Sequence, residues 1–267
     1  MIKTDKRFIY FTIPIVVLMT ISSGIGVFHP NLYARETTDW LSQTIGQDLS
    51  NLFVVVPALI LSSFFASRGS RAGMMIWIGV MITNIYSFVI YAFAVHFNFL
   101  FHVYCAILGL SIYSVLYFFK KYGNTDFKLW FTDKVAVKSV GMLLIVIAAL
   151  FALLWLSDSL PAVLRNTVPE NLVKDGLLTN PVHVLDFSFY LPLMVLSAIM
   201  LMKKQSLGYL LAPMMLVFAI MTAINIISLM AVSMMYLASN TWPMIGVFSI
   251  LVLVCLGFLW RMLIRLR

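Results

Sequence analysis

Long apolar runs alternate along this chain with short polar segments, such as 67–72 and 203–206. A helix needs about 20 apolar residues to cross the hydrocarbon core of a bilayer, and eight runs reach or approach that length. The pattern therefore predicts eight membrane-spanning helices in up-and-down order. They are expected over residues 8–28, 50–67, 73–95, 99–119, 136–157, 184–202, 207–235 and 241–263, the second and sixth being short.

Composition agrees with a membrane protein. Hydrophobic residues make up 62% of the chain and charged residues 10%, with a mean hydropathy of +1.01. A soluble domain has about 45–50% apolar and about 25% charged residues, so this chain cannot be a soluble globule, a disordered chain or a disulfide scaffold. Cys105 and Cys255 both fall inside apolar runs and are expected to be small buried apolar residues. The predicted fold class is an all-α, polytopic transmembrane helical bundle.

The net charge of +8 is explained by membrane topology. If the N-terminus is cytoplasmic, 15 of the 18 Lys and Arg residues lie in cytoplasmic segments, the exceptions being Arg35, Arg165 and Lys174. Most acidic residues fall on the opposite side. Cytoplasmic loops are typically enriched in Lys and Arg, so both termini are expected in the cytoplasm. The partner indicated is the lipid bilayer, and nucleic acid is not.

The chain matches itself at a shift of 135 residues. Segment 48–73 aligns without a gap on segment 183–208, so that Pro57 meets Pro192, Gly73 meets Gly208 and two basic turns coincide. The shift predicts two parallel halves of four spans each, 1–124 and 125–267, related by an axis along the membrane normal. The alternative is a pair of similar hairpins that share common turn chemistry.

Pro57 and Pro192 are expected to kink equivalent helices, because proline removes a backbone donor and its ring clashes with the preceding turn. Paired broken helices at a repeat interface are one sequence pointer to the binding site of a transporter. Proline is also common in membrane helices for reasons of packing alone.

Four polar residues form the candidate site. His183 and Asp186 are three apart, which places them on one helix face, and Asp48 and Asn51 are their equivalents at the shift of 135. If the halves pack about a pseudo-twofold axis, these side chains are expected to meet in an outward-facing pocket for a small molecule or lipid. His183, Asp186 and Asp48 are also weak candidates for metal ligands.

A simpler interpretation competes with this site. Asp48, Asn51 and Asp186 are typical helix N-caps or first-turn residues, and histidine often anchors helices at the interface. The middle of each predicted span carries only neutral polar side chains, which disfavours a proton-coupled pump with an acidic relay. Segments 29–47 and 158–182 are expected to form interfacial helices over the outer mouth, and 125–138 an interfacial linker between the halves.

Several runs resemble a family of uncharacterised bacterial multi-pass membrane proteins. They are GVFHPNLYA at 26–34, GQDLSNL at 46–52 with Pro57, RGSRAG at 68–73, VLD at 184–186 with Pro192, and LGYLLAP at 207–213. The resemblance covers most of the chain and implies a bacterial inner membrane. It implies no activity, so no functional residue is transferred.

Three functions remain open from the sequence. The first is a small-molecule or lipid transporter or binding protein. The second is a membrane-embedded, metal-dependent hydrolase that acts at the outer interface through His183, Asp186 and Asp48. The third is a non-catalytic sensor or accessory subunit. No nucleotide-binding, hydrolase or metal-binding motif identifies an enzyme or a cofactor.

Overall fold

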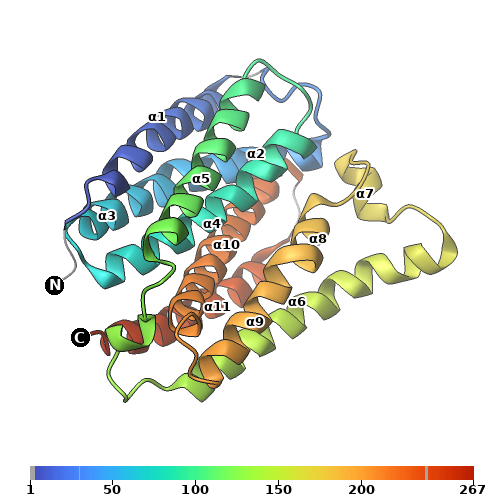
Figure 1. Cartoon of the computed structure of the whole chain (residues 1–267). Helices are drawn as coiled ribbons and strands as arrows, with labels where there is room; N and C mark the ends of the chain where they lie inside the picture. The colour runs from blue at the N-terminus through green and yellow to red at the C-terminus, as the bar shows by residue number, and fades with distance from the viewer. Residues whose placement is uncertain (1–3, 30, 238–239) are drawn as a thin grey trace.

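The computed structural model describes residues 4–29, 31–237 and 240–267, and these residues are almost entirely helical (Figure 1). Two π-helical segments, Asn51–Val55 and Asp186–Tyr190, join α2 to α3 and α8 to α9 without a break. The α-helices are α1 (Arg7–Phe28), α2 (Thr38–Ser50), α3 (Val56–Ser67), α4 (Arg71–Ala94), α5 (Phe101–Tyr122), α6 (Val137–Arg165), α7 (Glu170–Asp175), α8 (Pro181–Leu185), α9 (Leu191–Met202), α10 (Gly208–Leu237) and α11 (Trp242–Leu263).

The described part of the chain contains eight continuous helices that are long and apolar enough to cross a membrane, as predicted. The second is much longer than expected. It runs over Thr38–Ser67, so segment 38–47 is not an interfacial helix but the first part of this span. The sequence pattern missed these turns because their polar side chains, among them Ser42 and Thr44, are buried against neighbouring helices and so do not appear as an apolar run.

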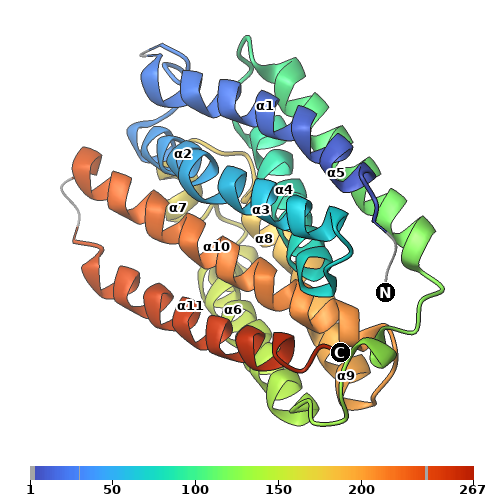
Figure 2. The same cartoon turned by 90° about the vertical axis from the view of Figure 1, so that its left-hand side faces the viewer.

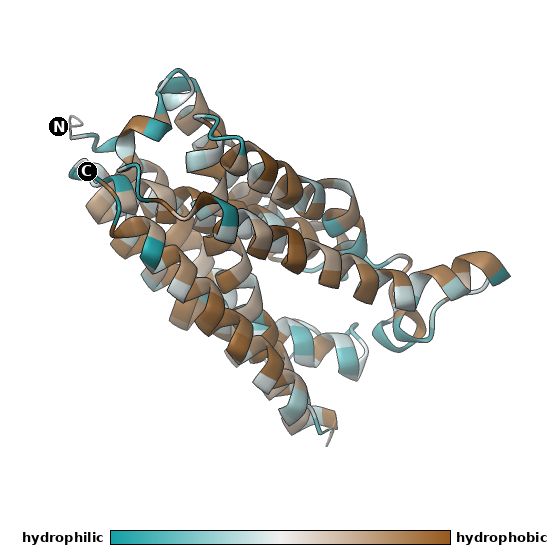
Figure 3. Cartoon of the chain, turned by 90° about the horizontal axis from the view of Figure 1, so that it is seen from below, coloured by the Kyte–Doolittle hydropathy of each residue, from teal (hydrophilic) through white to brown (hydrophobic). Residues whose placement is uncertain are grey.

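Helices α4 and α10 form the centre of the bundle. They pack against each other; α3 and α5 also pack on α4, and α2, α9 and α11 also pack on α10 (Figure 2). The outer helices keep large apolar side chains on their exposed faces, for example Ile13 and Val17 on α1 and Leu253 on α11. Apolar colouring runs along the helices and polar colouring gathers towards their ends (Figure 3). An apolar outer surface of this kind is suited to lipid, and the chain is therefore an integral membrane protein.

Both chain termini lie at the same end of the bundle, which we name the terminal end; the opposite end is the distal end (Figures 1 and 2). At the terminal end, segment 127–132 is held to the last residues of the chain. The Thr132 amide donates to the Arg265 carbonyl at 2.8 Å, and the Arg267 amide donates to the Trp130 carbonyl at 2.8 Å. The segment predicted as an interfacial linker therefore forms backbone hydrogen bonds with the C-terminal residues.

The two prolines occupy the same local structure. Pro57 and Pro192 are each the second residue of the α-helix that follows a π-helical segment, and the two π-helices begin at Asn51 and Asp186, again 135 residues apart. A π-helical turn contains one residue more than an α-helical turn, and it accommodates the loss of the backbone N–H donor at proline. The two helices therefore share one feature at equivalent positions, a π-helical turn before the proline, and the kink at each proline stays a prediction.

The hairpin turns that follow also match. Gly69 and Lys204, 135 residues apart, both have a left-handed backbone, with φ of 84° and 56°. An added Cβ on Gly73 would lie 2.6 Å from the Ala66 nitrogen, and on Gly208 it would lie 2.4 Å from the Leu201 nitrogen. The glycines recur because each lets one helix approach the backbone of the preceding one.

Candidate functional site

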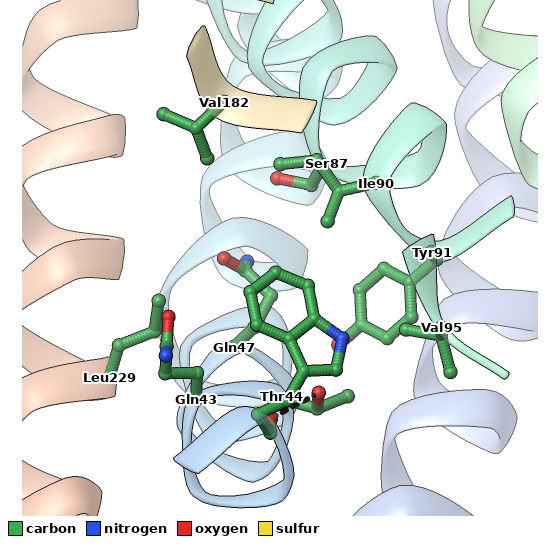
Figure 4. A pocket seen from close by; sticks show the side chains of 10 residues that line it. Gln43, Thr44, Gln47, Ser87, Ile90, Tyr91, Val95, Val182 and Leu229 are labelled. Carbon is green, nitrogen blue, oxygen red and sulfur yellow. Dashed lines mark hydrogen bonds between the residues drawn. The ribbon is translucent and has the colours of Figure 1, made fainter. Parts of the chain in front are cut away.

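A cavity of about 70 Å³ lies near the distal end between α2, α4, α8 and α10 (Figure 4). Its walls come from both parts of the chain, since α2 and α4 precede residue 125 and α8 and α10 follow it. No lining side chain carries a formal charge. The lining residues are Trp40, Gln43, Thr44, Gln47, Ser87, Ile90, Tyr91, Val95, Val182 and Leu229.

Two glutamines give the cavity its polar wall. The Gln43 amide nitrogen donates to Asp175 of α7 at 2.9 Å, and the Gln47 amide nitrogen donates to the Asn51 side-chain oxygen at 2.9 Å. Their amide oxygens accept no hydrogen bond from another described side chain, and both amides lie at the cavity wall in Figure 4. The glutamines therefore offer acceptors to a molecule in the cavity.

Asp48 lies directly behind this wall and is fully buried. Its Oδ1 accepts a hydrogen bond from the Tyr91 hydroxyl at 2.7 Å, and its Oδ2 accepts one from the Tyr33 hydroxyl at 2.6 Å. Gly26 of α1 makes room for the carboxylate, because an added Cβ there would lie 1.9 Å from Oδ2. Since Tyr91 also lines the cavity, one side chain connects the cavity with a buried carboxylate.

Asn51 continues the polar network along α2. It is buried, accepts from Gln47 and donates from Nδ2 to the Ser23 hydroxyl at 3.1 Å. Its neighbour Ser50 donates to the side-chain oxygen of Asn225 on α10 at 2.6 Å. The first turns of the second span are therefore tied by polar contacts both to α1 and to the later part of the chain.

His183 and Asp186 form a separate cluster with α6. The Trp155 indole donates to Asp186 Oδ2 at 2.7 Å, and the imidazole of His183 lies against the Trp155 ring with centroids 4.8 Å apart. His183 Nε2 is 3.9 Å from an Asp158 carboxylate oxygen. The imidazole therefore has Asp158, across on α6, as its ion-pair partner, although Asp186 shares its helix face.

The structure thus brings the four predicted site residues together in two pairs. Among the described residues no hydrogen bond or ion pair joins Asp48 or Asn51 to His183 or Asp186. The search for metal centres, restricted to the same residues, finds no group of three or more His, Cys, Asp or Glu side chains. The geometry of a single four-residue pocket is not observed in the described chain.

The simpler interpretation as helix caps is wrong for three of these residues. Thr37 caps α2 and Asn180 caps α8 with their side chains, whereas Asp48, Asn51 and Asp186 lie inside continuous helical segments. Two spans carry an acidic residue: Asp48 lies inside Thr38–Ser67, although outside the predicted span 50–67, and Asp186 lies inside Pro181–Met202, as predicted. The cap interpretation failed because the second and sixth spans start earlier than their apolar runs.

Sequence reasoning missed Gln43, Gln47 and Tyr91. The two glutamines fell in a segment assigned to a loop, and tyrosine near a span end is usually an interfacial anchor. One available signal was the spacing of Trp40, Gln43, Thr44 and Gln47, which places them on one face of a helix.

Helix α7 lies beside the start of α2, outside the spans. Burial raises the pKa of Asp175 to about 6, the nearby Asp39 charge adds to this increase, and the hydrogen bond from Gln43 opposes it. Because Gln43 also lines the cavity, the contact between Asp175 and Gln43 connects α7 to the site.

Comparison with protein-family models, with curated proteins and with solved structures gives no match to this chain.

Proposed function

We propose that this integral membrane protein is a transporter or binding protein for a small, uncharged polar solute, held in the cavity between α2, α4, α8 and α10. The observation that carries the proposal is the composition of this cavity. It is walled by helices from both parts of the chain, it offers hydrogen-bonding side chains without a formal charge, and it adjoins a buried carboxylate.

A four-plus-four internal repeat supports this placement. The π-helices, the prolines after them, the left-handed turn residues and the close-approach glycines all recur at a shift of 135. We infer that residues 1–124 and 125–267 are parallel halves. Helices α2 and α8, and likewise α4 and α10, are then equivalent pairs, and the cavity lies at the repeat interface, where many transporters bind their substrates.

The cavity favours a small polar solute over a lipid. A cavity volume of about 70 Å³ suits a small solute rather than a lipid chain. Gln43 and Gln47 supply acceptors, and Trp40 and Tyr91 supply flat apolar faces. A solute with several hydrogen-bond donors and no net charge fits this chemistry.

We place the protein in a bacterial inner membrane with the terminal end in the cytoplasm. Lys and Arg concentrate in the segments at that end, whereas the distal end carries Glu36, Asp39 and Asp175. Positive residues favour the cytoplasmic side, so the cavity would then open towards the outside of the cell. Family resemblance supports the bacterial assignment.

A stabilisation screen tests the proposal. Uncharged polar solutes, such as small amides and small polyols, are added to purified protein in detergent while Tm is measured. A ligand that binds only the folded state raises Tm. Ser87→Leu fills the cavity, and Ser157→Leu on the exposed face of α6 is the matched control.

At least one solute is expected to raise the Tm of the wild type and of Ser157→Leu but not that of Ser87→Leu. A panel without any stabilising solute, or one whose effect survives in Ser87→Leu, contradicts the cavity as the binding site. Uptake of the same solute into proteoliposomes then separates a transporter from a binding protein.

A further inference from the structure

Three aspartates are buried in the described chain, and they differ in their partners. Asp5, at the terminal end, forms an ion pair with Lys121 and accepts from the Tyr117 hydroxyl at 3.0 Å. Asp48 and Asp186 have no Lys, Arg or His within ion-pair distance among the described residues. Both lie inside candidate spans, where an uncompensated charge is costly.

Every element around Asp48 presents a neutral group to it. Ser23 and Gly26 come from α1, Tyr33 from the segment before α2, Tyr91 from α4 and Tyr104 from α5. The next charged group in this direction is Glu36, near Tyr104, and it is itself paired with His96 at 2.8 Å. A negative charge on Asp48 therefore has no compensating cation within ion-pair distance among the described residues.

The Tyr104 hydroxyl is the second observation. It is buried and has no hydrogen-bond partner among the described residues, although its ring lies 5.0 Å from the Tyr91 ring and its hydroxyl lies near that of Tyr33. Buried hydroxyls are normally satisfied, so one without a partner needs an explanation. Beyond Tyr104, Asn98 and the Glu36–His96 pair continue towards the distal surface. Polar groups thus extend from Asp48 to the distal end.

We propose that Asp48 is a proton-binding site that takes up and releases a proton at the distal face through Tyr33 and Tyr104. Uptake converts the Asp48 carboxylate and a proton from the distal solution into a neutral carboxylic acid, and release reverses this step with no other bond changed. Neutralisation by a proton removes the cost of a buried charge without a metal cage, which the described residues do not supply.

Protonation of Asp48 also changes the cavity, and this part of the proposal rests on the proposed function. An ionised Asp48 accepts from both Tyr33 and Tyr91, whereas a protonated Asp48 has its own O–H, which needs an acceptor. If the Tyr91 oxygen accepts it, the Tyr91 hydrogen turns towards the cavity that this residue lines. Protonation thereby adds a donor to the solute site, so solute binding and proton uptake favour each other.

The first test uses the solute-free protein in lipid. Infrared difference spectra are recorded along a pH titration, with Asp48→Asn and Asp186→Asn as paired variants. The carbonyl band of a protonated carboxylic acid is expected in the wild type and in Asp186→Asn, and its complete loss is expected in Asp48→Asn. A band that persists in Asp48→Asn, or no titrating band in the wild type, overturns the proposal.

Two further measurements sharpen this test. Replacing sodium and potassium by choline must leave the titration unchanged; a titration that shifts with the alkali ion assigns the compensating charge to a metal cation and overturns the proton site. Asp48→Asn and Asp186→Asn must both retain the wild-type elution profile. Loss of the band in Asp48→Asn then does not reflect loss of the fold.

The coupling is tested with a solute found in the stabilisation screen. Its effect on Tm is expected to weaken as pH rises in the wild type and to become independent of pH in Tyr91→Phe. Unchanged pH dependence in Tyr91→Phe overturns the coupling. The infrared titration needs no solute. A solute screen that finds no ligand therefore does not affect the test of the proton site and counts against the proposed function alone.

Discussion

The two parts of the chain use one backbone device and surround it with different chemistry. Asn51 opens the π-helix of the second span, beside Asp48 and its two tyrosines, and Asp186 opens the π-helix of the sixth, beside Trp155 and His183. The turn, the proline and the glycine that follow are equivalent. The two segments therefore share their backbone geometry and differ in the side chains that surround it.

The difference begins with the length of the preceding helix. α2 has 13 residues before its π-helix, and α8 has five. The additional turns of α2 carry Trp40, Gln43 and Gln47 into the bundle. The residues before α8 instead form the short helix α7 and its loop, and α7 packs against α2. The comparison shows that two hairpins with the same local backbone differ in the length of their first helix, and that the candidate site lies beside the longer one.

The largest expected effect tests the shared backbone. Gly73→Val and Gly208→Val each force a side chain against a backbone nitrogen, so each is expected to lower the free energy of unfolding by about 3 kcal/mol. Gly109→Val and Gly257→Val are matched controls, since no atom lies within 4 Å of an added Cβ at either position. Unfolding of the detergent-solubilised protein in SDS measures all four. If Gly208→Val were as stable as the control Gly257→Val, the close helix approach at Gly208 would not be needed for stability. The two hairpins would then not be equivalent.

The next effect tests the part that is not shared. Gly26→Ala is expected to cost about 2 kcal/mol, because its Cβ would displace the Asp48 carboxylate from Tyr33. Gly24→Ala on the same helix meets no atom within 4 Å and is expected to be neutral. Equal stability of the two variants in SDS unfolding would show that Asp48 is not held tightly against α1.

The sequence predicted the eight helices and the equivalence of Pro57 with Pro192, because apolar length and proline spacing are local signals. It did not predict that the second span begins at Thr38, since the polar residues of its first turns are buried by contacts distant in sequence, such as Ser42 with Ser233. For the same reason, the sequence did not predict the contacts between Asp48 and the tyrosines around it. Tyr33, Tyr91 and Tyr104 meet only when the segment before α2 packs against α4 and α5.

A smaller effect, confined to one loop, concerns α7. The pKa of Asp175 rises from 3.8 to about 6 in the folded protein, so docked α7 holds a proton that a released Asp175 would lose. Raising the pH from 3.8 to about 6 therefore weakens the docking of α7, with no further change above about 6. Hydrogen exchange of α7 amides, corrected for intrinsic rates, is expected to be faster above this pH range than below it. Asp175→Asn keeps an acceptor for Gln43 without the charge and should show no such change.

The smallest effect concerns the turn residues Gly69 and Lys204, which share a left-handed backbone. Gly69→Lys is expected to lower the free energy of unfolding by about 1 kcal/mol, because a side chain is strained at positive φ. Lys204→Gly relieves that strain but adds freedom to the unfolded chain, so a change below about 0.5 kcal/mol is expected. SDS unfolding of both variants and of the double variant measures this. A large loss in Lys204→Gly would mean that the Lys204 side chain makes an essential contact, and the two turns would then share a shape without sharing its cause.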